Sequence, residues 1–199
     1  MARLAEFVRA RAQETYPEPP SEGHDEITRK VLPEVTARLD DGWSVLDVGC
    51  GQGVALEEFQ SRGYVVTGTT LNDNDLAILR AKGFEDVLLC DMHEMPEDWT
   101  GRYDLVWARH VLEHSVAPFF VLHEFHRVLK PAAWLYVEVP GPDTECNHEA
   151  NQNHYSVLGQ RAWLCLLHRA GFEVLEGREM KLMTGAGPDV YFGWVCRKQ

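Results

Sequence analysis

A glycine-rich turn near residue 50 is the part of the sequence best suited to holding a ligand. Residues 45–53 read VLDVGCGQG, an apolar run containing Asp47 that is followed by Gly49, Gly51 and Gly53. Because glycine has no Cβ atom, a ligand can approach the backbone closely there. A buried strand that turns directly into a helix also presents backbone N–H groups to a ligand. The pattern therefore predicts a site for a nucleotide-like molecule.

The spacing of these glycines argues against a dinucleotide. The usual fingerprint is G-x-G-x-x-G, and the third glycine would fall at Val54 or Leu56 in this chain. NAD is therefore disfavoured.

The string D-V-G-C-G-Q-G instead resembles motif I of the class I S-adenosylmethionine-dependent methyltransferases. The resemblance continues through LLCDMHEMP (88–96) and YDLVWARHVLEHSVAPFFVLHEFHRVLKP (103–131), and it covers roughly residues 43–175. It implies that S-adenosylmethionine is the cofactor. It also implies the fold of that family, a doubly wound α/β fold with a seven-stranded, mostly parallel Rossmann-like sheet, helices on both faces and an antiparallel last strand.

The resemblance assigns cofactor contacts along three strands. Asp47 and the glycine turn resemble the floor of the methionine end, and Asp91 and Met92 resemble the residues that bind and stack on adenine. Where the family usually has an acidic residue for the ribose, this chain has Thr70 and Leu71, a variant similar to G-V-T-L-S in methyltransferases that resemble cyclopropane fatty acid synthases. The predicted cofactor-binding residues are Asp47, Gly49, Cys50, Gly51, Gly53, Thr70, Leu71, Asp91, Met92 and Arg109.

Histidines near the strand ends are the candidates for a catalytic base, because imidazole titrates near neutral pH. We predict this role for His110, His114 or His154. The O-methyltransferases of ubiquinone biosynthesis carry E-x-x-E-H at this place and are thought to hold a divalent metal, whereas this chain reads H-V-L-E-H, with His110 replacing the first glutamate. We predict no metal here. In the polar segment 139–156, His148, His154 and Tyr155 are candidates for the acceptor side.

Alternating apolar runs and helical patterns predict the elements that position these residues. The predicted strands are 43–48, 64–69, 84–90, 103–108, 133–139, 172–177 and 190–196, and the predicted helices include 3–12, 25–39, 117–129 and 156–170. We expect one methyltransferase domain over 1–199, with a helical extension or lid over 1–40 and a cofactor-binding core over 41–199. The prolines in 16–20 predict a break in the extension, and Pro33 predicts a kink in the second helix.

The composition of the chain limits the classes of molecule that we expect it to bind. The net charge is −12, which repels phosphate backbones, so nucleic acid is an improbable substrate. No apolar run approaches the ~18 residues that span a membrane, and the five cysteines form no C-x-x-C pair. We expect a cytoplasmic protein with reduced thiols, a small-molecule substrate and no membrane partner. The oligomeric state is not predicted.

These observations predict a small-molecule methyltransferase, with O-methylation favoured and N-methylation left open. Two alternatives remain. One is cyclopropane-type transfer to a lipid, which only the G-T-T-L-N string favours. The other is a non-catalytic protein that binds S-adenosylmethionine as a partner or regulator.

Overall fold

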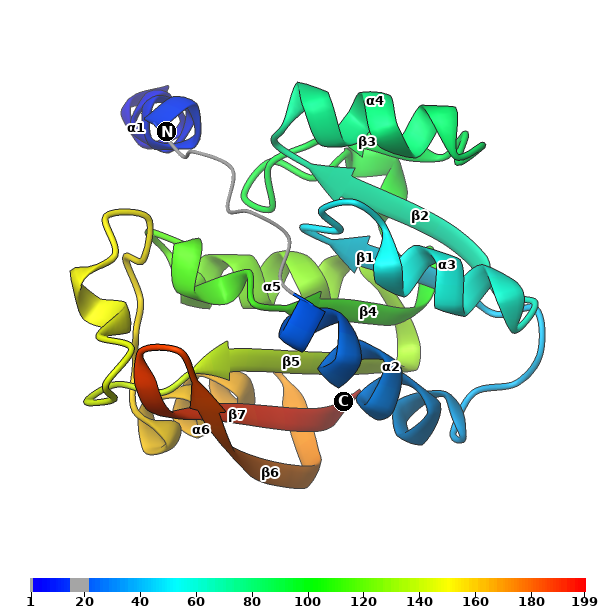
Figure 1. Cartoon of the computed structure of the whole chain (residues 1–199). Helices are drawn as coiled ribbons and strands as arrows, with labels where there is room; N and C mark the ends of the chain where they lie inside the picture. The colour runs from blue at the N-terminus through cyan, green and yellow to red at the C-terminus, as the bar shows by residue number, and fades with distance from the viewer. Residues whose placement is uncertain (1, 15–21) are drawn as a thin grey trace. The chain divides into compact units, whose positions relative to one another are not determined.

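A computed structural model describes residues 2–14 and 22–199 of the chain (Figure 1). The predicted break at residues 16–20 lies outside the described residues. Contacts between Cα atoms divide the chain into two compact units, Met1–Met95 and Pro96–Gln199. Each unit is described in turn.

The first unit contains three parallel strands. Its elements are α1 (Ala2–Glu14), α2 (Glu22–Thr36), β1 (Ser44–Val48), α3 (Val54–Ser61), β2 (Val65–Thr70), α4 (Asp73–Ala81) and β3 (Val87–Leu89). Strand β2 pairs in parallel with β1 on one side and with β3 on the other. The carboxyl ends of the three strands therefore meet at one edge, and the segments predicted to bind the cofactor follow those ends. Helix α2 runs without interruption through Pro33, so the chain does not start a new helix there.

Apolar packing around the glycine turn holds this edge together. Strand β1 is buried from Val45 to Val48, as expected for a strand covered on both faces. A cluster of five buried residues packs the turn against α3, α4 and β3. Its members are Cys50, Leu56, Leu79, Phe84 and Val87. The position of the turn is thus set by the same side chains that form the core.

The second unit contains four strands. Its elements are η1 (Glu97–Trp99), β4 (Tyr103–Arg109), η2 (Leu112–His114), α5 (Pro118–Val128), β5 (Leu129–Pro140), η3 (His148–Ala150), α6 (Gln160–Arg169), β6 (Phe172–Thr184) and β7 (Gly187–Lys198). Strand β4 pairs in parallel with β5, whereas β7 runs antiparallel to both β5 and β6. Three tryptophans, Trp107, Trp163 and Trp194, are among its largest fully buried side chains.

The strand order in the seven-stranded sheet is β3-β2-β1-β4-β5-β7-β6. The fold class predicted from the sequence, a mostly parallel Rossmann-like sheet with an antiparallel last strand, is confirmed. No helix in the described ranges is both long enough and apolar enough to cross a membrane.

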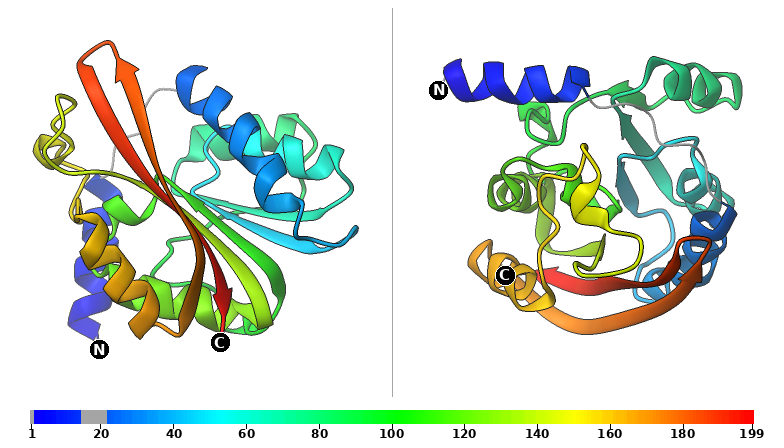
Figure 2. Two further views of the ribbon diagram at one scale, coloured as in Figure 1. Left: turned by 90° about the horizontal axis from the view of Figure 1, so that it is seen from below. Right: turned by 60° about the vertical axis from the view of Figure 1, so that its left-hand side comes forward.

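The last two strands are much longer than their apolar segments predict. Strands β6 and β7 form a hairpin that pairs from Phe172 and Lys198 to Thr184 and Gly187 (Figure 2). Strand β5 pairs with β7 only as far as Tyr191, so residues 187–190 pair with β6 alone. Most residues of β6 are exposed or half-buried. Its outer part therefore lacks the continuous apolar run by which a buried strand is recognised.

Candidate cofactor and acceptor sites

The glycine turn after β1 adopts a backbone shape that favours glycine at three positions. Gly49, Gly51 and Gly53 have φ angles of 68°, 49° and 89°. A Cβ atom built on Gly51 would have no heavy atom of the described residues within 4 Å, so this part of the turn borders open space. The turn therefore leaves room for a ligand to lie against the backbone at Gly51, which fits the methionine end of S-adenosylmethionine.

Two other residues of the turn, Gly53 and Cys50, face the protein interior. A Cβ atom on Gly53 would lie 2.4 Å from Cδ2 of Leu79, so glycine is required there for packing. The Cys50 side chain belongs to the buried cluster, and burial raises the pKa of its thiol. Cys50 can thus offer a ligand its backbone, whereas its side chain packs in the core.

The end of β2 carries the predicted ribose contacts. Thr70 is buried and its hydroxyl accepts a hydrogen bond from the Asn72 N–H at 3.1 Å. The Asn72 side chain accepts a hydrogen bond from the Asn74 N–H at 2.9 Å, which makes Asn72 the N-cap of α4. Leu71 is 48% exposed. Thr70 is therefore oriented by the same turn that starts α4.

The segment after β3 places Asp91 in a tight turn. Its Oδ1 atom accepts hydrogen bonds from the His93 backbone N–H at 2.8 Å and from the His93 ring at 2.6 Å. Oδ2 takes no part in these two bonds. Met92 beside it is 9% exposed. A carboxylate oxygen and an apolar side chain are adjacent here, and these are the two groups that the resemblance requires for adenine.

Buried charges are concentrated at the end of β4 in the second unit. Arg109 Nε lies 2.7 Å from Glu138 Oε1, and His110 lies 3.2 Å from Glu113 and 3.3 Å from Glu138. The ring of Tyr191 packs against the His110 ring, with centroids 4.3 Å apart. Glu113 and Glu138 are 1% and 0% exposed. The positive φ of His110, 53°, allows its side chain to meet both carboxylates.

These contacts shift the pKa values of His110, Glu113 and Glu138. Burial alone would lower the pKa of His110, but its bonds to Glu113 and Glu138 outweigh burial and raise it. Burial alone would raise the pKa of Glu138, but His110 and the charge of Arg109 lower it to about 2. The pKa of Glu113 is also lowered, because the bond from His110 outweighs burial. The raised pKa of His110 favours its protonated form, which pairs with the two carboxylates.

The other two predicted bases lie together. His114 and His154 have ring centroids 4.8 Å apart, and His114 Nδ1 lies 3.1 Å from the Asn153 carbonyl oxygen. If Nδ1 donates to that carbonyl, Nε2 of His114 is the acceptor nitrogen. Ligand atoms of Glu113, His114 and His154 lie within 4.8 Å of one another, a geometry that could hold a cation.

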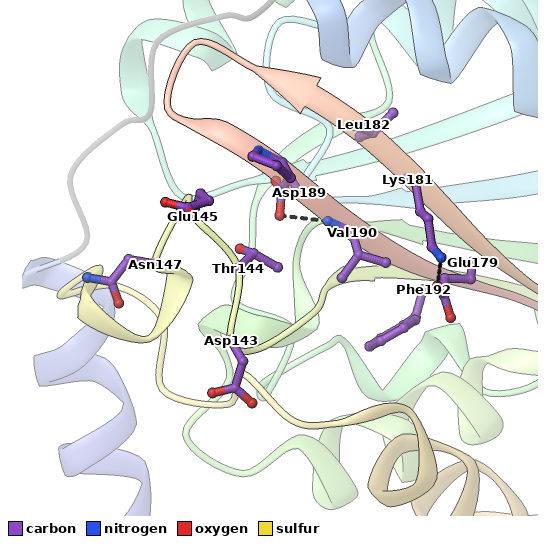
Figure 3. Close-up of a pocket in the computed structure, with 11 residues that line it drawn as sticks. Asp143, Thr144, Glu145, Asn147, Glu179, Lys181, Leu182, Asp189, Val190 and Phe192 are labelled. Carbon is purple, nitrogen blue, oxygen red and sulfur yellow. Dashed lines mark hydrogen bonds and ion pairs between the residues drawn. The ribbon is translucent and has the colours of Figure 1, made fainter.

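A cavity of about 750 Å³ lies beside the segment 143–147 and the outer hairpin (Figure 3). Figure 3 shows Thr144 and Glu145 on the loop and Asp189, Lys181 and Phe192 on the two strands. The volume is in the range of small-molecule sites. Of the predicted acceptor-side residues, His148 lies 3.0 Å from both carboxylate oxygens of Asp189, which lines this cavity.

Sequence reasoning missed three functional candidates of the second unit: Glu138, Asp189 and Tyr191. Glu138 lies within the apolar strand AWLYVEV, and a carboxylate in a run that must be buried is itself a signal of a buried partner. Asp189 offered no comparable signal, because the strand that carries it was expected to start at residue 190, and Tyr191 read as an ordinary aromatic residue of that strand.

The model of the methyltransferase domain family matches residues 20–176 of the chain. The chain therefore belongs to the methyltransferase domain family, as the resemblance to class I S-adenosylmethionine-dependent methyltransferases predicts.

A curated relative supports membership of this family. The chain is 31% identical over 133 residues to a ubiquinone biosynthesis O-methyltransferase of Pseudomonas paraeruginosa, an alignment that covers 64% of the chain and 55% of the relative. The chain thus spans about half the length of the curated relatives it matches.

Solved structures show the same fold. A putative methyltransferase from Bacillus halodurans superposes with a TM-score of 0.72 at 19% identity, over 86% of this chain and 98% of that one. A 1,6-didemethyltoxoflavin N1-methyltransferase from Burkholderia thailandensis, solved with bound 1,6-didemethyltoxoflavin and S-adenosylhomocysteine, has a TM-score of 0.71 at 22% identity. That match covers 86% of this chain and 78% of the other.

Proposed function

We propose that this chain transfers the methyl group of S-adenosylmethionine to an oxygen atom of a small-molecule acceptor. The observation that carries the proposal is the open backbone at Gly51, in a turn where Gly53 lies against Leu79 and Cys50 packs in the core. Membership of the methyltransferase domain family and the similarity to ubiquinone biosynthesis O-methyltransferases support it. Oxygen is favoured as the methylated atom because of those relatives.

The residues of the first unit would hold the cofactor. Asp47 and the backbone of the glycine turn would receive the methionine end, Thr70 and Leu71 the ribose, and Asp91 with Met92 the adenine. When bound, S-adenosylmethionine supplies a methyl group on a positively charged sulfur. Alignment of the acceptor with that methyl group is worth up to about 7–11 kcal/mol in favourable cases.

Helix α1 would act as a cover on the adenine side, as the predicted lid over residues 1–40 requires. Arg9 makes a two-bond ion pair with Glu94, with both N–O distances 2.9 Å. Glu94 follows Asp91 and Met92 by two to three residues. The guanidinium is 65% exposed, so the pair adds little stability and can open. This is the behaviour that entry of a cofactor needs.

His114 is the base we favour among the three predicted histidines. The raised pKa of His110 favours its protonated form, which is a poor acceptor of another proton. His114 can keep Nε2 unprotonated while Nδ1 donates to Asn153. A hydroxyl acceptor that arrives protonated would give its proton to this nitrogen.

Calorimetric titration with S-adenosylhomocysteine tests the cofactor site. Gly51→Ala places a methyl group in the open space, and we expect at least a tenfold loss of affinity. Gly63→Ala is the matched control, because Gly63 has a φ of 85° and equally open surroundings in the turn before β2. Equal affinity of both variants would contradict the cofactor assignment.

Transfer is tested with S-adenosylmethionine labelled in its methyl group and a panel of phenols, sugars and carboxylic acids. The proposal expects label in an oxygen-linked methyl group and expects His114→Gln to lower kcat. His123→Gln, on the exposed face of α5, is the control. Tight cofactor binding without a labelled product would favour the regulatory alternative.

A further inference from the structure

Three side chains of different chemistry meet where the loop after β5 approaches β7. They are Cys146, His148 and Asp189, and their ligand atoms all lie within 4.8 Å of one another. His148 Nε2 lies 3.0 Å from both carboxylate oxygens of Asp189. The cluster therefore combines a thiol, an imidazole and a carboxylate at one point.

Backbone contacts hold the loop against β7 on both sides of the cluster. The Gly141 N–H donates to the Val190 carbonyl at 2.8 Å, and the Glu145 N–H donates to the Pro188 carbonyl at 3.2 Å. A Cβ atom on Gly187 would lie 2.7 Å from the Glu145 Cβ, so the two segments are in close contact. The three side chains are thus positioned by main chain that is already fixed.

Burial separates this cluster from a chance group of surface acids. The Asp189 side chain is 1% exposed and that of His148 is 16% exposed. Asp189 is the only carboxylate in the group, and it also accepts a hydrogen bond from the Val190 N–H at 2.8 Å. A buried carboxylate aimed at an imidazole and a thiol is arranged for a cation with mixed ligand preference.

We propose that Cys146, His148 and Asp189 bind one Zn²⁺ ion. Zinc accepts thiolate sulfur, imidazole nitrogen and carboxylate oxygen in tetrahedral sites, whereas Mg²⁺ and Ca²⁺ prefer oxygen ligands alone. Bond lengths of about 2.0–2.3 Å place tetrahedral ligand atoms roughly 3.3–3.8 Å apart. The three ligand atoms lie within 4.8 Å of one another, and to reach this spacing His148 Nε2 must separate slightly from the Asp189 oxygens, which lie 3.0 Å from it. On binding, the thiol proton of Cys146 passes to the solvent.

Neighbouring groups complete the site. Thr184 Oγ1 lies 3.1 Å from Cys146 Sγ and donates its proton to the Gly187 carbonyl oxygen at 2.9 Å, which fixes the hydroxyl beside the thiol. Three protein ligands leave one tetrahedral position for water or another oxygen ligand. Because Asp189 also lines the 750 Å³ cavity, the ion lies at the edge of that cavity. The site requires neither S-adenosylmethionine nor methyl transfer, so it stands apart from the proposed function.

The first test uses the wild-type chain, cleared of metal with a chelator and titrated with Zn²⁺ against a colorimetric competitor. We expect one equivalent to bind and to protect Cys146 from iodoacetamide at least tenfold, as measured by peptide mass spectrometry. The exposed Cys165 is the internal control and should alkylate at an unchanged rate. Absence of Zn²⁺ binding, or binding that leaves Cys146 unprotected, overturns the proposal.

Binding of Co²⁺ in place of Zn²⁺ identifies the side chains that coordinate the metal. Co²⁺ bound to the wild-type chain should give a thiolate-to-metal charge-transfer band, which Cys146→Ser abolishes and Cys165→Ser retains. His148→Gln and Asp189→Asn should weaken Zn²⁺ binding by at least 100-fold, with folding checked by circular dichroism. Should a variant fail to fold, the wild-type protection experiment still decides. His154→Gln separates this site from the Glu113, His114 and His154 group: abolished binding in that variant, with Cys146 left reactive, assigns the ion there and overturns the proposal.

Discussion

Arg109 Nε and Glu138 Oε1 are 2.7 Å apart, and their side chains are only 8% and 0% exposed. Removal of one member of such a buried pair leaves the other charge without compensation, which costs about 3–5 kcal/mol. Glu138→Gln should therefore lower the free energy of unfolding by that amount in urea titrations. Glu179→Gln is the comparison, because its ion pair with Lys181 is exposed and its loss should change stability by less than about 1 kcal/mol. Similar losses for the two variants would contradict the assignment of a buried network.

The same network predicts how stability depends on pH. The pKa of Glu138 is lowered from 4.5 to about 2, so its contribution is complete above pH 4.5 and is lost as the pH falls toward 2. The pKa of His110 is raised above 6.5, so its contribution is complete below pH 6.5 and is lost as the pH rises through the raised value. The network should stabilise the fold most between pH 4.5 and 6.5.

Urea unfolding at intervals from pH 3 to pH 9, with a chelator present, measures this dependence. The wild-type chain should lose stability as the pH rises above 6.5, and this loss should be absent in the His110→Gln variant. A wild-type chain that gains stability relative to His110→Gln as the pH rises above 6.5 would refute the sign of the shift.

Packing in the glycine turn gives a third prediction. Gly53→Ala and Gly63→Ala both place a Cβ atom on a backbone with positive φ, which costs about 1–2 kcal/mol. Only Gly53→Ala also drives a methyl group against Leu79, and such overpacking adds typically 1–3 kcal/mol. Gly53→Ala should therefore unfold at a clearly lower urea concentration. Equal midpoints would mean that α4 moves aside without loss.

The cysteines should differ in reactivity. Cys196 is fully buried and burial raises its pKa to about 12, while Cys165 is exposed. Because the thiolate is the reactive form, iodoacetamide at pH 8 should label Cys165 rapidly and leave Cys196 unlabelled in the folded chain. Labelling in urea is the control, since both thiols should react there. Rapid labelling of Cys196 under native conditions would show that the end of β7 opens readily.

Local signals predicted the alternation of strands and helices and the glycine turn, while the resemblance to class I methyltransferases supplied the antiparallel last strand. Apolar runs such as VLDV mark buried parallel strands, and three glycines in five residues mark a turn that needs positive φ. The extent of β6 and β7 could not be predicted, because their outer parts pair with each other and carry polar residues. Helix α2 contains Pro33 although proline lacks the N–H that would bond to the carbonyl four residues earlier.

The side-chain networks were beyond sequence reasoning for a different reason. His110 was predicted as a base, and the sequence did not reveal its contact with Glu138, which is 28 residues away and pairs with Arg109 across β4 and β5. His148 and Asp189 are separated by 41 residues. Spacing along the chain shows which groups share one helix or strand, and it does not show which groups two strands bring together.

The outer arm of the β6 and β7 hairpin, in which residues 187–190 of β7 pair with β6 and not with β5, can differ in length between related chains. The arm's length is not tied to the register of the remaining strands. Pairs of residues can be gained or lost at its tip without shifting any other strand. Because this arm forms one wall of the cavity, related chains can enlarge or shrink that cavity through hairpin length alone.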